Sequence, residues 1–360
     1  MTSLRSRSAK FTIKDVARAA GVSPMTASRA LHRPEQVASA TRARVLRVCR
    51  RLNYQPNASA RTLRTRESKH IGVLVPDLRN SFWIEVVSGV EQVFTKAGFD
   101  LLIGNSNEEL GQLASGAQAM ASRLVDGLLI APTVGSTELI RSLQREGHPL
   151  VLLDRRPPGV RGQHSVVIDN EAGAFAGTRH LIEAGHERIG LLAGNINLDT
   201  GRQRLAGYRR ALRSAGLRAR PEFIRTAETN AALVGRQVGY LGSLELLDRP
   251  HGPTAILCTS STITVGALSA LQERRVRLPD DVALVTFGDP EWAVLVNPPL
   301  TVVTQPTFDL GRQAALILLD QLRSKQPGGV PMQVILEPQL LVRASSGPHR
   351  VRSNGHHRSG

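Results

Sequence analysis

The sequence predicts an all-helical N-terminal head followed by a two-lobed α/β core with parallel sheets. Three observations lead to this fold class. The chain has 360 residues, which is enough for two or three domains. Residues 11–56 carry apolar side chains at helical spacing, whereas short apolar runs alternate with amphipathic stretches from residue 71 onward. The formal net charge of +16 is concentrated near the N-terminus rather than spread evenly.

The charge divides the chain into a basic head, a neutral body and a short basic tail. Residues 1–70 hold 16 Lys and Arg against 3 Asp and Glu, a net charge of +13, whereas residues 71–342 have a net charge of −1. Residues 343–360 add four arginines and no acid. A head this basic predicts a polyanionic partner, most often nucleic acid. A general bias toward arginine is the alternative, but the near-neutral body argues against it.

Composition excludes several classes of protein. Hydrophobic residues make up 41% and charged residues 21%, which is typical of a globular chain rather than a disordered one. The sequence contains no run of about 18 apolar residues, so it predicts no bilayer-spanning helix. The first ten residues, MTSLRSRSAK, lack the apolar stretch of a secretory signal. The two cysteines, Cys49 and Cys258, suit a reducing compartment. We therefore expect a cytoplasmic protein.

Two short helices open the head. Thr12 is the predicted N-cap of the first, and Gly21 ends it because glycine adopts positive φ without strain. The apolar residues of this helix recur at the i, i+3, i+4 and i+7 positions of one face: Ile13, Val16, Ala17 and Ala20. Ser23 is the expected N-cap of the second helix, and Pro24 is its first residue.

These two helices, joined by Gly-Val-Ser, describe a helix-turn-helix, and a third helix is expected from about residue 40 to 52. In such a motif the second helix enters the major groove and presents its N-terminal side chains to base edges. The candidate reading residues are Ser23, Met25, Thr26, Ser28, Arg29 and His32. Arg29 is the best candidate for a bidentate guanine contact or a phosphate clamp. A three-helix cap without a nucleic-acid role is the alternative, which the charge of the segment makes less favourable.

The head resembles a known family. The segment TIKDVARAAGVSPMTASRAL, followed by NYQPNASARTL, resembles the DNA-binding head of the LacI/GalR family of bacterial repressors, and MTASRALHRPEQV is most similar to its gluconate-type members. Two departures are Ala27, where valine is usual, and His32, where asparagine is common. The resemblance implies DNA contacts by further residues: Thr12, Ile13, Pro24, Gln36, Thr41, Tyr54, Asn57, Ala60 and Leu63.

The basic stretch NASARTLRTR, residues 57–66, by itself indicates only a linker. The resemblance implies that residues 57–70 contain the family's hinge helix, which is ordered on operator DNA and lies in the minor groove beside its copy from a second subunit. Leu63 matches the side chain that wedges between the central base pairs. Such a wedge costs a few kcal/mol of unstacking, which the contacts allowed by the bend offset. Ala60 is small enough for a close approach, and Arg61 and Arg64 can contact phosphates.

From residue 71 the pattern predicts two α/β lobes. Continuous apolar strands separated by helices indicate parallel sheets covered on both faces. One series of strands comprises IGVLVPD, DLLIGNS, DGLLIAPT and PLVLLD, with helices over 81–97, 110–123 and 136–146. A second series comprises VVIDN, IGLLAG, FIRTAE, AILCTS and VALVTFGD, with helices near 171–185, 201–215, 231–248 and 263–274. Ligands of such sheets bind at the carboxyl ends of the strands, and a cleft between lobes is a favoured pocket.

The stretch after Pro298 is expected to return across both lobes, with a helix near 308–324. Together with PDLRNSFWIEVVSGVEQ and RQRLAGYRRALRSAG, it resembles the periplasmic-binding-protein-like core of the same family, and the whole resemblance covers residues 11 to about 346. The expected order is a flexible basic arm (residues 1–10), the helix-turn-helix domain (11–56) and the hinge with its linker (57–70). The effector-binding core (71–346) and a disordered basic tail (347–360) follow. Lobe 1 is expected over about 71–167 and 302–328, and lobe 2 over about 168–301 and 329–346.

An effector is expected in the cleft between the lobes. By resemblance, Arg204 is the family's effector arginine, and Asp154 accepts hydrogen bonds from sugar hydroxyls. Strand ends and helix starts add further candidates: Asn80, Ser81, Phe82, Trp83, Ser261 and Asp289. Trp292 is expected to stack on a sugar ring. The structural alternatives are that Asp154 caps a turn, that Arg204 pairs with a surface acid, and that the aromatic residues belong to the core.

One departure from the family pattern bears on the charge of the effector. Thr259-Ser260-Ser261 stand where many members have Ala-Asn-Asp, and Thr229-Asn230 stand in place of an aromatic residue. A serine makes fewer hydrogen bonds than an aspartate and carries no charge. With Arg202 and Arg204 nearby, the sequence favours a sugar acid or sugar phosphate over a neutral sugar.

The sequence therefore predicts a homodimeric repressor that binds a near-palindromic operator through its heads and a small sugar, sugar acid or sugar phosphate through its core. A solute-binding sensor that acts on a protein partner is the alternative. No catalysis, cofactor, metal or membrane association is expected, since no nucleotide-binding, zinc-protease or nucleophile-elbow motif occurs. The tail lacks apolar heptads, which favours a dimer over a tetramer. The pattern leaves open whether the ligand is an inducer or a corepressor.

Overall fold

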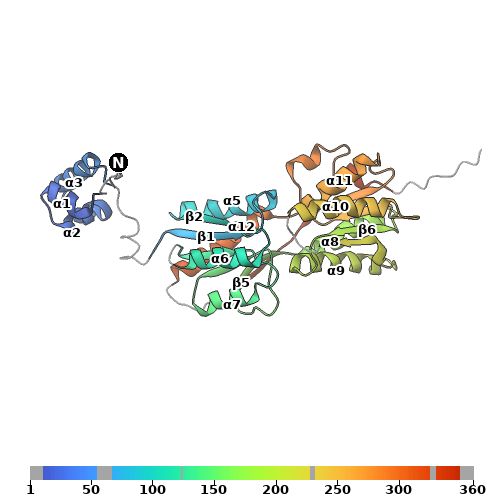
Figure 1. Cartoon of the computed structure of the whole chain (residues 1–360), viewed down its shortest axis with the longest axis horizontal. Coiled ribbons are helices and arrows are strands. Elements are labelled where there is room, and N and C mark those ends of the chain that lie inside the picture. Colours follow the sequence, from blue (N-terminus) through green and yellow to red (C-terminus); the bar gives the residue numbers. More distant parts are fainter. Residues whose placement is uncertain (1–10, 55–66, 123–124, 228–231, 325–329, 349–360) are drawn as a thin grey trace, which may run out of the picture. The chain divides into compact units, whose positions relative to one another are not determined.

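The computed structural model describes residues 11–54, 67–122, 125–227, 232–324 and 330–348. It divides into two compact units, one before and one after the Ser68–Lys69 bond (Figure 1). Among the described helices, none is both long and apolar enough to cross a membrane.

The head unit is built from three helices around a small apolar core. They are α1 (Ile13–Ala20), α2 (Pro24–His32) and α3 (Ser39–Arg51), with a 3-10 turn η1 (Pro34–Gln36) after α2. The core consists of small and β-branched side chains from all three helices: Val16, Ala17, Ala20, Ala27, Ala30, Val45, Val48 and Cys49. The small residues allow α1 and α2 to approach closely, which suits a short turn between them.

The predicted caps set the ends of the first two helices. The hydroxyl and the backbone N–H of Thr12 both donate to the Asp15 carboxylate, at 2.7 and 2.9 Å. These bonds lower the pKa of Asp15 below its ordinary value. Gly21 ends α1 with a φ of 62°. The Ser23 hydroxyl accepts from the backbone N–H of Thr26 at 3.0 Å, and Pro24 opens α2.

The core unit contains two six-stranded sheets, one in each lobe (Figure 1). The sheet of lobe 1 has the order β11-β5-β4-β3-β1-β2, and all its neighbouring strands are parallel. Its strands are β1 (His70–Val75), β2 (Asp100–Asn105), β3 (Gly127–Ile130), β4 (Leu150–Leu153), β5 (His164–Ile168) and β11 (Gln333–Leu336). The predicted parallel sheet is confirmed in this lobe.

The sheet of lobe 2 has the order β12-β10-β9-β8-β6-β7. Its strands are β6 (Ile189–Ala193), β7 (Ile224–Thr226), β8 (Ala255–Cys258), β9 (Ala283–Phe287), β10 (Thr301–Thr304) and β12 (Gln339–Leu341). All neighbouring pairs are parallel except β10 and β12, which are antiparallel. The edge strand β12 therefore departs from the wholly parallel sheet that was expected.

Helices cover both faces of each sheet and bury its apolar strands. In lobe 1, α5 (Ser81–Lys96) and α12 (Thr307–Arg323) cover one face, and α6 (Leu110–Ala121) and α7 (Thr137–Arg145) the other. In lobe 2, α8 (Asn170–Glu183) and α9 (Asp199–Ser214) cover one face, and α10 (Ala232–Leu247) and α11 (Ser261–Glu273) the other. Short 3-10 turns complete the fold: η2 (Pro221–Phe223), η3 (Glu291–Val294) and η4 (Ala344–Ser346).

The chain crosses between the lobes three times, and two crossings differ from the expected boundaries. The first follows β5, close to the predicted boundary at residues 167 and 168. The second lies between β10 and α12, so that residues 302–304 belong to lobe 2 rather than lobe 1. The third lies between β11 and β12, so that residues 333–336 belong to lobe 1 rather than lobe 2. Compared with the prediction, β10 therefore lies in lobe 2 instead of lobe 1, and β11 lies in lobe 1 instead of lobe 2. Apolar runs alone do not specify which strands pair.

Candidate DNA-binding head and effector cavity

Helix α2 presents its N-terminal side chains to solvent. Ser23, Pro24, Met25 and Arg29 are exposed, and the side chain of Met25 is 64% accessible. Thr26, Ser28 and Thr41 are partly buried, and Gln36 is exposed. Tyr54 and Ile13 pack against the head's apolar core, and Thr12 is engaged in its cap. The side chain of His32, and all of Asn57, Ala60 and Leu63, lie outside the described residues, so the predicted hinge contacts stay predictions.

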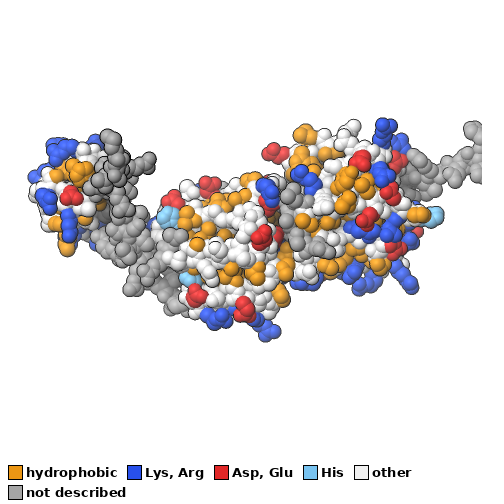
Figure 2. Space-filling view, viewed as in Figure 1, with side chains coloured by type: hydrophobic (Ala, Val, Ile, Leu, Met, Phe, Trp, Pro, Cys, Tyr) orange, Lys and Arg blue, Asp and Glu red, His pale blue; other side chains and the backbone are white. Residues whose placement is uncertain are grey.

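Helix α3 adds basic side chains to the surface of the head. Helix α3 exposes five arginines away from the apolar core: Arg42, Arg44, Arg47, Arg50 and Arg51. Figure 2 shows basic side chains around the described part of the head. An exposed helix N-terminus beside a basic helix provides a reading surface together with phosphate-binding side chains.

In the core unit, a cavity of about 300 Å³ lies between the two lobes, at the carboxyl ends of their strands. Lobe 1 contributes the N-terminus of α5 and the segments after β1, β2 and β4. Lobe 2 contributes α9, the start of α11 and the segments after β8, β9 and β10. Eight expected effector residues line this cavity: Asn80, Ser81, Phe82, Trp83, Asp154, Arg204, Ser261 and Asp289. Their contact with a ligand stays a prediction.

The expectation for Trp292 is wrong. Its indole does not line the cavity but packs against the apolar core of lobe 2, near Ala293 and Leu300. Burial of a large aromatic side chain against this core removes apolar surface from water, which favours packing over exposure to the cavity. The aromatic residues on the wall are Trp83, which is 3% exposed, the partly buried Phe82 and the buried Phe287.

Asp154 is a buried carboxylate at the end of β4. It is 4% exposed, and its backbone has a φ of 64°. Its Oδ2 lies 3.3 Å from the Nε of Arg155, whereas its Oδ1 has no hydrogen-bond partner among the described residues. Burial raises the pKa of Asp154, and the charges of Arg155 and Arg204 oppose this rise.

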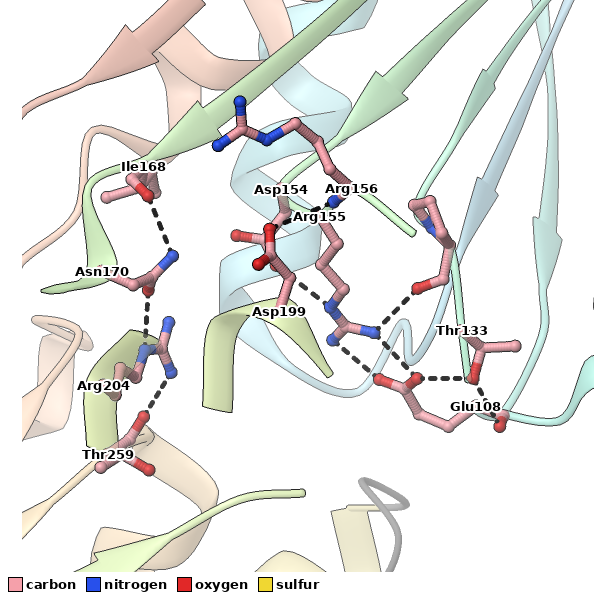
Figure 3. Close-up of polar contacts among 11 residues, drawn as sticks. Glu108, Thr133, Asp154, Arg155, Arg156, Ile168, Asn170, Asp199, Arg204 and Thr259 are labelled. Carbon is pink, nitrogen blue, oxygen red and sulfur yellow. Dashed lines mark hydrogen bonds and ion pairs between the residues drawn. The ribbon is translucent and has the colours of Figure 1, made fainter. Parts of the chain in front are cut away.

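Arg155 joins Asp154 to a second buried carboxylate, Glu108, in the segment after β2 (Figure 3). Its Nη1 donates to Glu108 Oε2 at 2.9 Å, and its Nη2 lies 2.8 Å from Glu108 Oε1. Nη1 also donates to the carbonyl of Pro132 at 3.2 Å. The hydroxyl of Thr133 donates to Glu108 at its carbonyl, 2.9 Å, and at Oε2, 3.2 Å. Burial lowers the pKa of Arg155, but Glu108 and Asp154 raise it more strongly, so the net direction is upward.

Arg204 faces this network from α9 in lobe 2. Its Nε donates to Asn170 Oδ1 at 2.7 Å, and its Nη1 donates to the carbonyl of Thr259. The guanidinium lies 4.6 Å from the ring centre of Phe287. Burial lowers the pKa of Arg204 to about 10, against the favourable charge of Asp154. Arg204 therefore remains a cation at neutral pH, held in place by its own lobe.

The other acids at the cavity wall have partners of their own. Asp289 forms a bidentate pair with Arg343, with both distances 2.7 Å. Asp77 accepts from the Nε of Arg79 at 2.9 Å. Arg202, expected to add positive charge to the cleft, instead pairs with Asp199 at 3.0 Å and is absent from the cavity wall. The excess of positive charge on which the anionic effector depended is therefore not found there.

Comparisons with known proteins agree with both units. The head matches the lacI family of bacterial regulatory proteins over residues 12–57, and residues 178–346 match the periplasmic binding protein-like domain. The ribose operon repressor of Haemophilus influenzae is 35% identical over 339 residues, which cover 93% of this chain and 98% of that protein. The chain belongs to the lacI family.

Two solved structures extend this similarity. The lac repressor dimer bound to operator and the anti-inducer ONPF has a TM-score of 0.80 and 26% identity, over 94% of this chain and 99% of that one. The complex of the transcriptional regulator CelR with cellobiose has a TM-score of 0.69 and 32% identity, over 93% of this chain and 99% of that one. The similarity spans head and core together.

This lacI-family chain is accordingly a DNA-binding transcriptional regulator with a small-molecule-binding core. Because whole-length relatives combine the same head and core, a sensor that acts through a protein partner is not favoured. Its relatives are transcriptional repressors rather than enzymes.

Glu108, Arg155 and Gln305 also line the cavity, and none of them was predicted to contact an effector. Each follows the carboxyl end of a strand, since β2 ends at Asn105, β4 at Leu153 and β10 at Thr304. The rule that ligands bind at such ends points to all three positions. The rule does not indicate that Arg155 and Glu108, which are 47 residues apart in the sequence, form an ion pair.

Proposed function

We propose that this chain is a homodimeric transcriptional repressor whose effector is a neutral, polyhydroxylated molecule the size of a monosaccharide or nucleoside. One observation carries the proposal. Two buried side-chain atoms with no hydrogen-bond partner among the described residues belong to side chains of the cavity wall: Asp154 Oδ1 and Gln305 Nε2. An acceptor accompanied by a donor is complementary to hydroxyl groups, which both donate and accept.

The charges of the wall support a neutral ligand. The carboxylates of Asp77, Asp289 and Glu108 are each neutralised by an arginine. Asp154 and Arg204 then face each other as opposite charges, where each is a major influence on the other's pKa. Glu85, which accepts from the hydroxyl of Thr307, adds a further acid to the wall. An anionic ligand that approached Arg204 would meet Asp154 at the same time. We therefore replace the sugar acid or sugar phosphate expected from the sequence with a neutral sugar.

Size and relatives point the same way. A cavity of about 300 Å³ is at the lower end of the range of ligand pockets, which suits one or two small rings. The aromatic face of Phe82 on the wall provides a surface for a sugar ring. The relatives named above include a ribose operon repressor and a regulator solved with cellobiose. Ribose is therefore the first ligand to test.

The effector acts by favouring one arrangement of the two lobes. Its hydroxyls would bridge Asp154 in lobe 1 to Arg204 in lobe 2, and residues 57–70 would pass the change to the heads. We propose that binding weakens operator affinity, by the 5–150-fold that is typical of allosteric coupling of about 1–3 kcal/mol. Because bacterial operator DNA lies in the cytoplasm, we place the protein there, without a catalytic role.

Calorimetric titration of the full chain tests the effector class. Ribose, adenosine, cellobiose, gluconate and ribose 5-phosphate would be titrated under one set of conditions. We expect heat of binding with a neutral ligand and little with the two anions. Fluorescence anisotropy with DNA from upstream of the chain's own operon, with and without the ligand found, then measures the coupling. Tight binding of an anion alone would refute the proposal.

A further inference from the structure

Arg155 contacts two buried carboxylates at once, from opposite edges of its guanidinium. Its Nη atoms hold Glu108 at 2.8 and 2.9 Å, and its Nε lies 3.3 Å from Asp154 Oδ2 (Figure 3). The side chains of Arg155 and Glu108 are both less than a tenth exposed. Trp83 lies beside the guanidinium, with its ring centre 5.8 Å away. The arginine is therefore fixed by several partners rather than free to follow a ligand.

This arrangement determines which oxygen of Asp154 is available. The contact with Nε engages Oδ2 and leaves Oδ1, which is buried, without a partner among the described residues. Glu108 occupies the Nη atoms that could otherwise form a two-pronged pair with Asp154. Without Glu108, the guanidinium would be free to engage both oxygens of Asp154, which would leave this carboxylate without an unpaired acceptor.

Arg155 also sets the charge that the cavity presents. The charged groups near Asp154 are Arg155 beside it, Glu108 after β2, and Arg204 on α9. Asp199, at the start of α9, accepts from the backbone N–H of the adjacent Arg156 at 3.4 Å. With Arg155 present, its charge and that of Glu108 cancel. Without it, the buried acids Asp154 and Glu108 would be opposed by Arg204 alone.

We propose that Arg155, held by Glu108, is a positioning residue that keeps Asp154 turned and charged as a hydroxyl acceptor, and thereby makes this site select hydroxylated over anionic ligands. This inference rests on the proposed function for the identity of the ligand. The geometry of the three side chains, however, predicts behaviour that can be measured in the free protein. Loss of Arg155 should raise the pKa of Asp154 further, because a close opposite charge lowers a carboxylate pKa by about 1–3 units.

The experiment uses the full chain and four variants: Arg155→Met, Arg155→Lys, Glu108→Gln and, as a matched control, Arg141→Met. Arg141 pairs with Glu138 on the surface of α7, away from the cavity. Isotope-edited infrared spectroscopy follows the carboxyl band of Asp154 against pH without ligand, and Asp154→Asn identifies the band. We expect the midpoint to rise by at least about one pH unit in Arg155→Met. The midpoint should stay near the wild-type value in Arg155→Lys and Arg141→Met.

Calorimetry with ribose against pH supplies the second readout. We expect Arg155→Met to lose about tenfold or more in affinity at acidic pH, with partial recovery as the pH rises and Asp154 ionises. Glu108→Gln should lose affinity without gaining this pH dependence, because Arg155 remains to keep Asp154 ionised. The lysine variant should restore the wild-type pH profile, which a purely structural role would not require.

The outcomes separate this inference from the proposed function. If wild-type protein binds none of the neutral ligands, the proposed function fails, and the infrared midpoints still decide the role of Arg155. An unchanged midpoint in Arg155→Met overturns the inference whatever binds. Ribose binding that is equal in wild type and Arg155→Met at every pH also overturns it, while leaving the effector class intact. If Arg155→Met does not fold, Glu108→Gln and Arg155→Lys carry the test.

Discussion

The substitution Asp154→Asn should shift the preference of the effector cavity from neutral sugars toward sugar acids. Asn has nearly the shape of Asp and, like Asp, tolerates the positive φ of 64° found at this position, whereas alanine would add backbone strain. The substitution removes one negative charge from a buried group that also contains Glu108, Arg155 and Arg204. The cluster therefore changes from neutral to a net charge of +1.

The expected magnitude follows from the hydrogen bond that is weakened. A bond to a charged group contributes about 1.5–3 kcal/mol, and one between neutral groups about 0.5–1.5 kcal/mol. The difference of about 1–1.5 kcal/mol corresponds to a five- to tenfold loss of affinity for a neutral sugar. A sugar acid should gain affinity, because Arg204 no longer faces a competing carboxylate.

Calorimetry with ribose and gluconate on both proteins measures the ratio of the two affinities. Asp248→Asn is the matched control, since Asp248 forms a surface pair with Arg274 at 2.9 Å and does not line the cavity. We expect the ratio to shift toward the acid by at least tenfold in Asp154→Asn alone. An unchanged ratio would refute the view that Asp154 sets the charge preference of the site.

Three further predictions concern the rest of the chain. The core from Lys69 onward should fold and bind ligand but not operator DNA, since it is a separate compact unit; operator binding by this fragment, measured by anisotropy, would contradict the division of roles. Arg29→Met should weaken operator binding by roughly 1–3 kcal/mol and flatten the preference for one base pair, whereas Arg44→Met, on exposed α3, should weaken binding to all DNA sequences alike. Burial lowers the pKa of His180, which bonds to the hydroxyl of Ser346 at 2.7 Å. The unfolded chain then binds more protons below a pH of about 6.5, so stability falls as the pH drops below that value. Thermal melts should show a weaker acid sensitivity in His180→Gln, and equal sensitivity in both proteins would exclude this histidine as a cause.

The head could be predicted closely because its determinants are local. Thr12, Gly21 and Ser23 act within a few residues of their own helix ends, and the structure places each at the predicted cap. Apolar runs likewise identified the strands β1 to β9. They did not show that β10 lies in lobe 2 and β11 in lobe 1, the reverse of the expectation. The place of a strand in a sheet depends on which strand it can pair with after the chain has crossed between the lobes.

The chemistry of the cavity was harder to predict for the same reason. A position at a strand end places a side chain at the cavity, and this was enough for Asp154 and Asp289. It does not decide whether an aromatic residue such as Trp292 turns toward the cavity or into the adjacent core. Nor does it give the charge of the site, which depends on the partner of each acid.

Those partners range from local to distant. The pair of Asp77 and Arg79 spans two residues, whereas Asp289 and Arg343 are 54 residues apart. The first kind of pair can be inferred from a sequence, and the second exists only in the folded chain. A count of acids and arginines along the cavity wall therefore overestimates the charge that a ligand meets. This is why the arginines near the cleft suggested an anionic effector, whereas the pairing of the acids leads us to propose a neutral one.

Asp154 and Arg204, the opposite charges that face each other in the cavity, come from different lobes. Asp154 is held by Arg155 and Glu108 of lobe 1, and Arg204 by Asn170 and Thr259 of lobe 2. Each lobe thus fixes its own charge, and the distance between the two charges depends on how the lobes are arranged. A ligand that bonds to both must bind one arrangement more tightly than another. Such a difference in affinity is the physical requirement for an effector in the core to control the DNA-binding head.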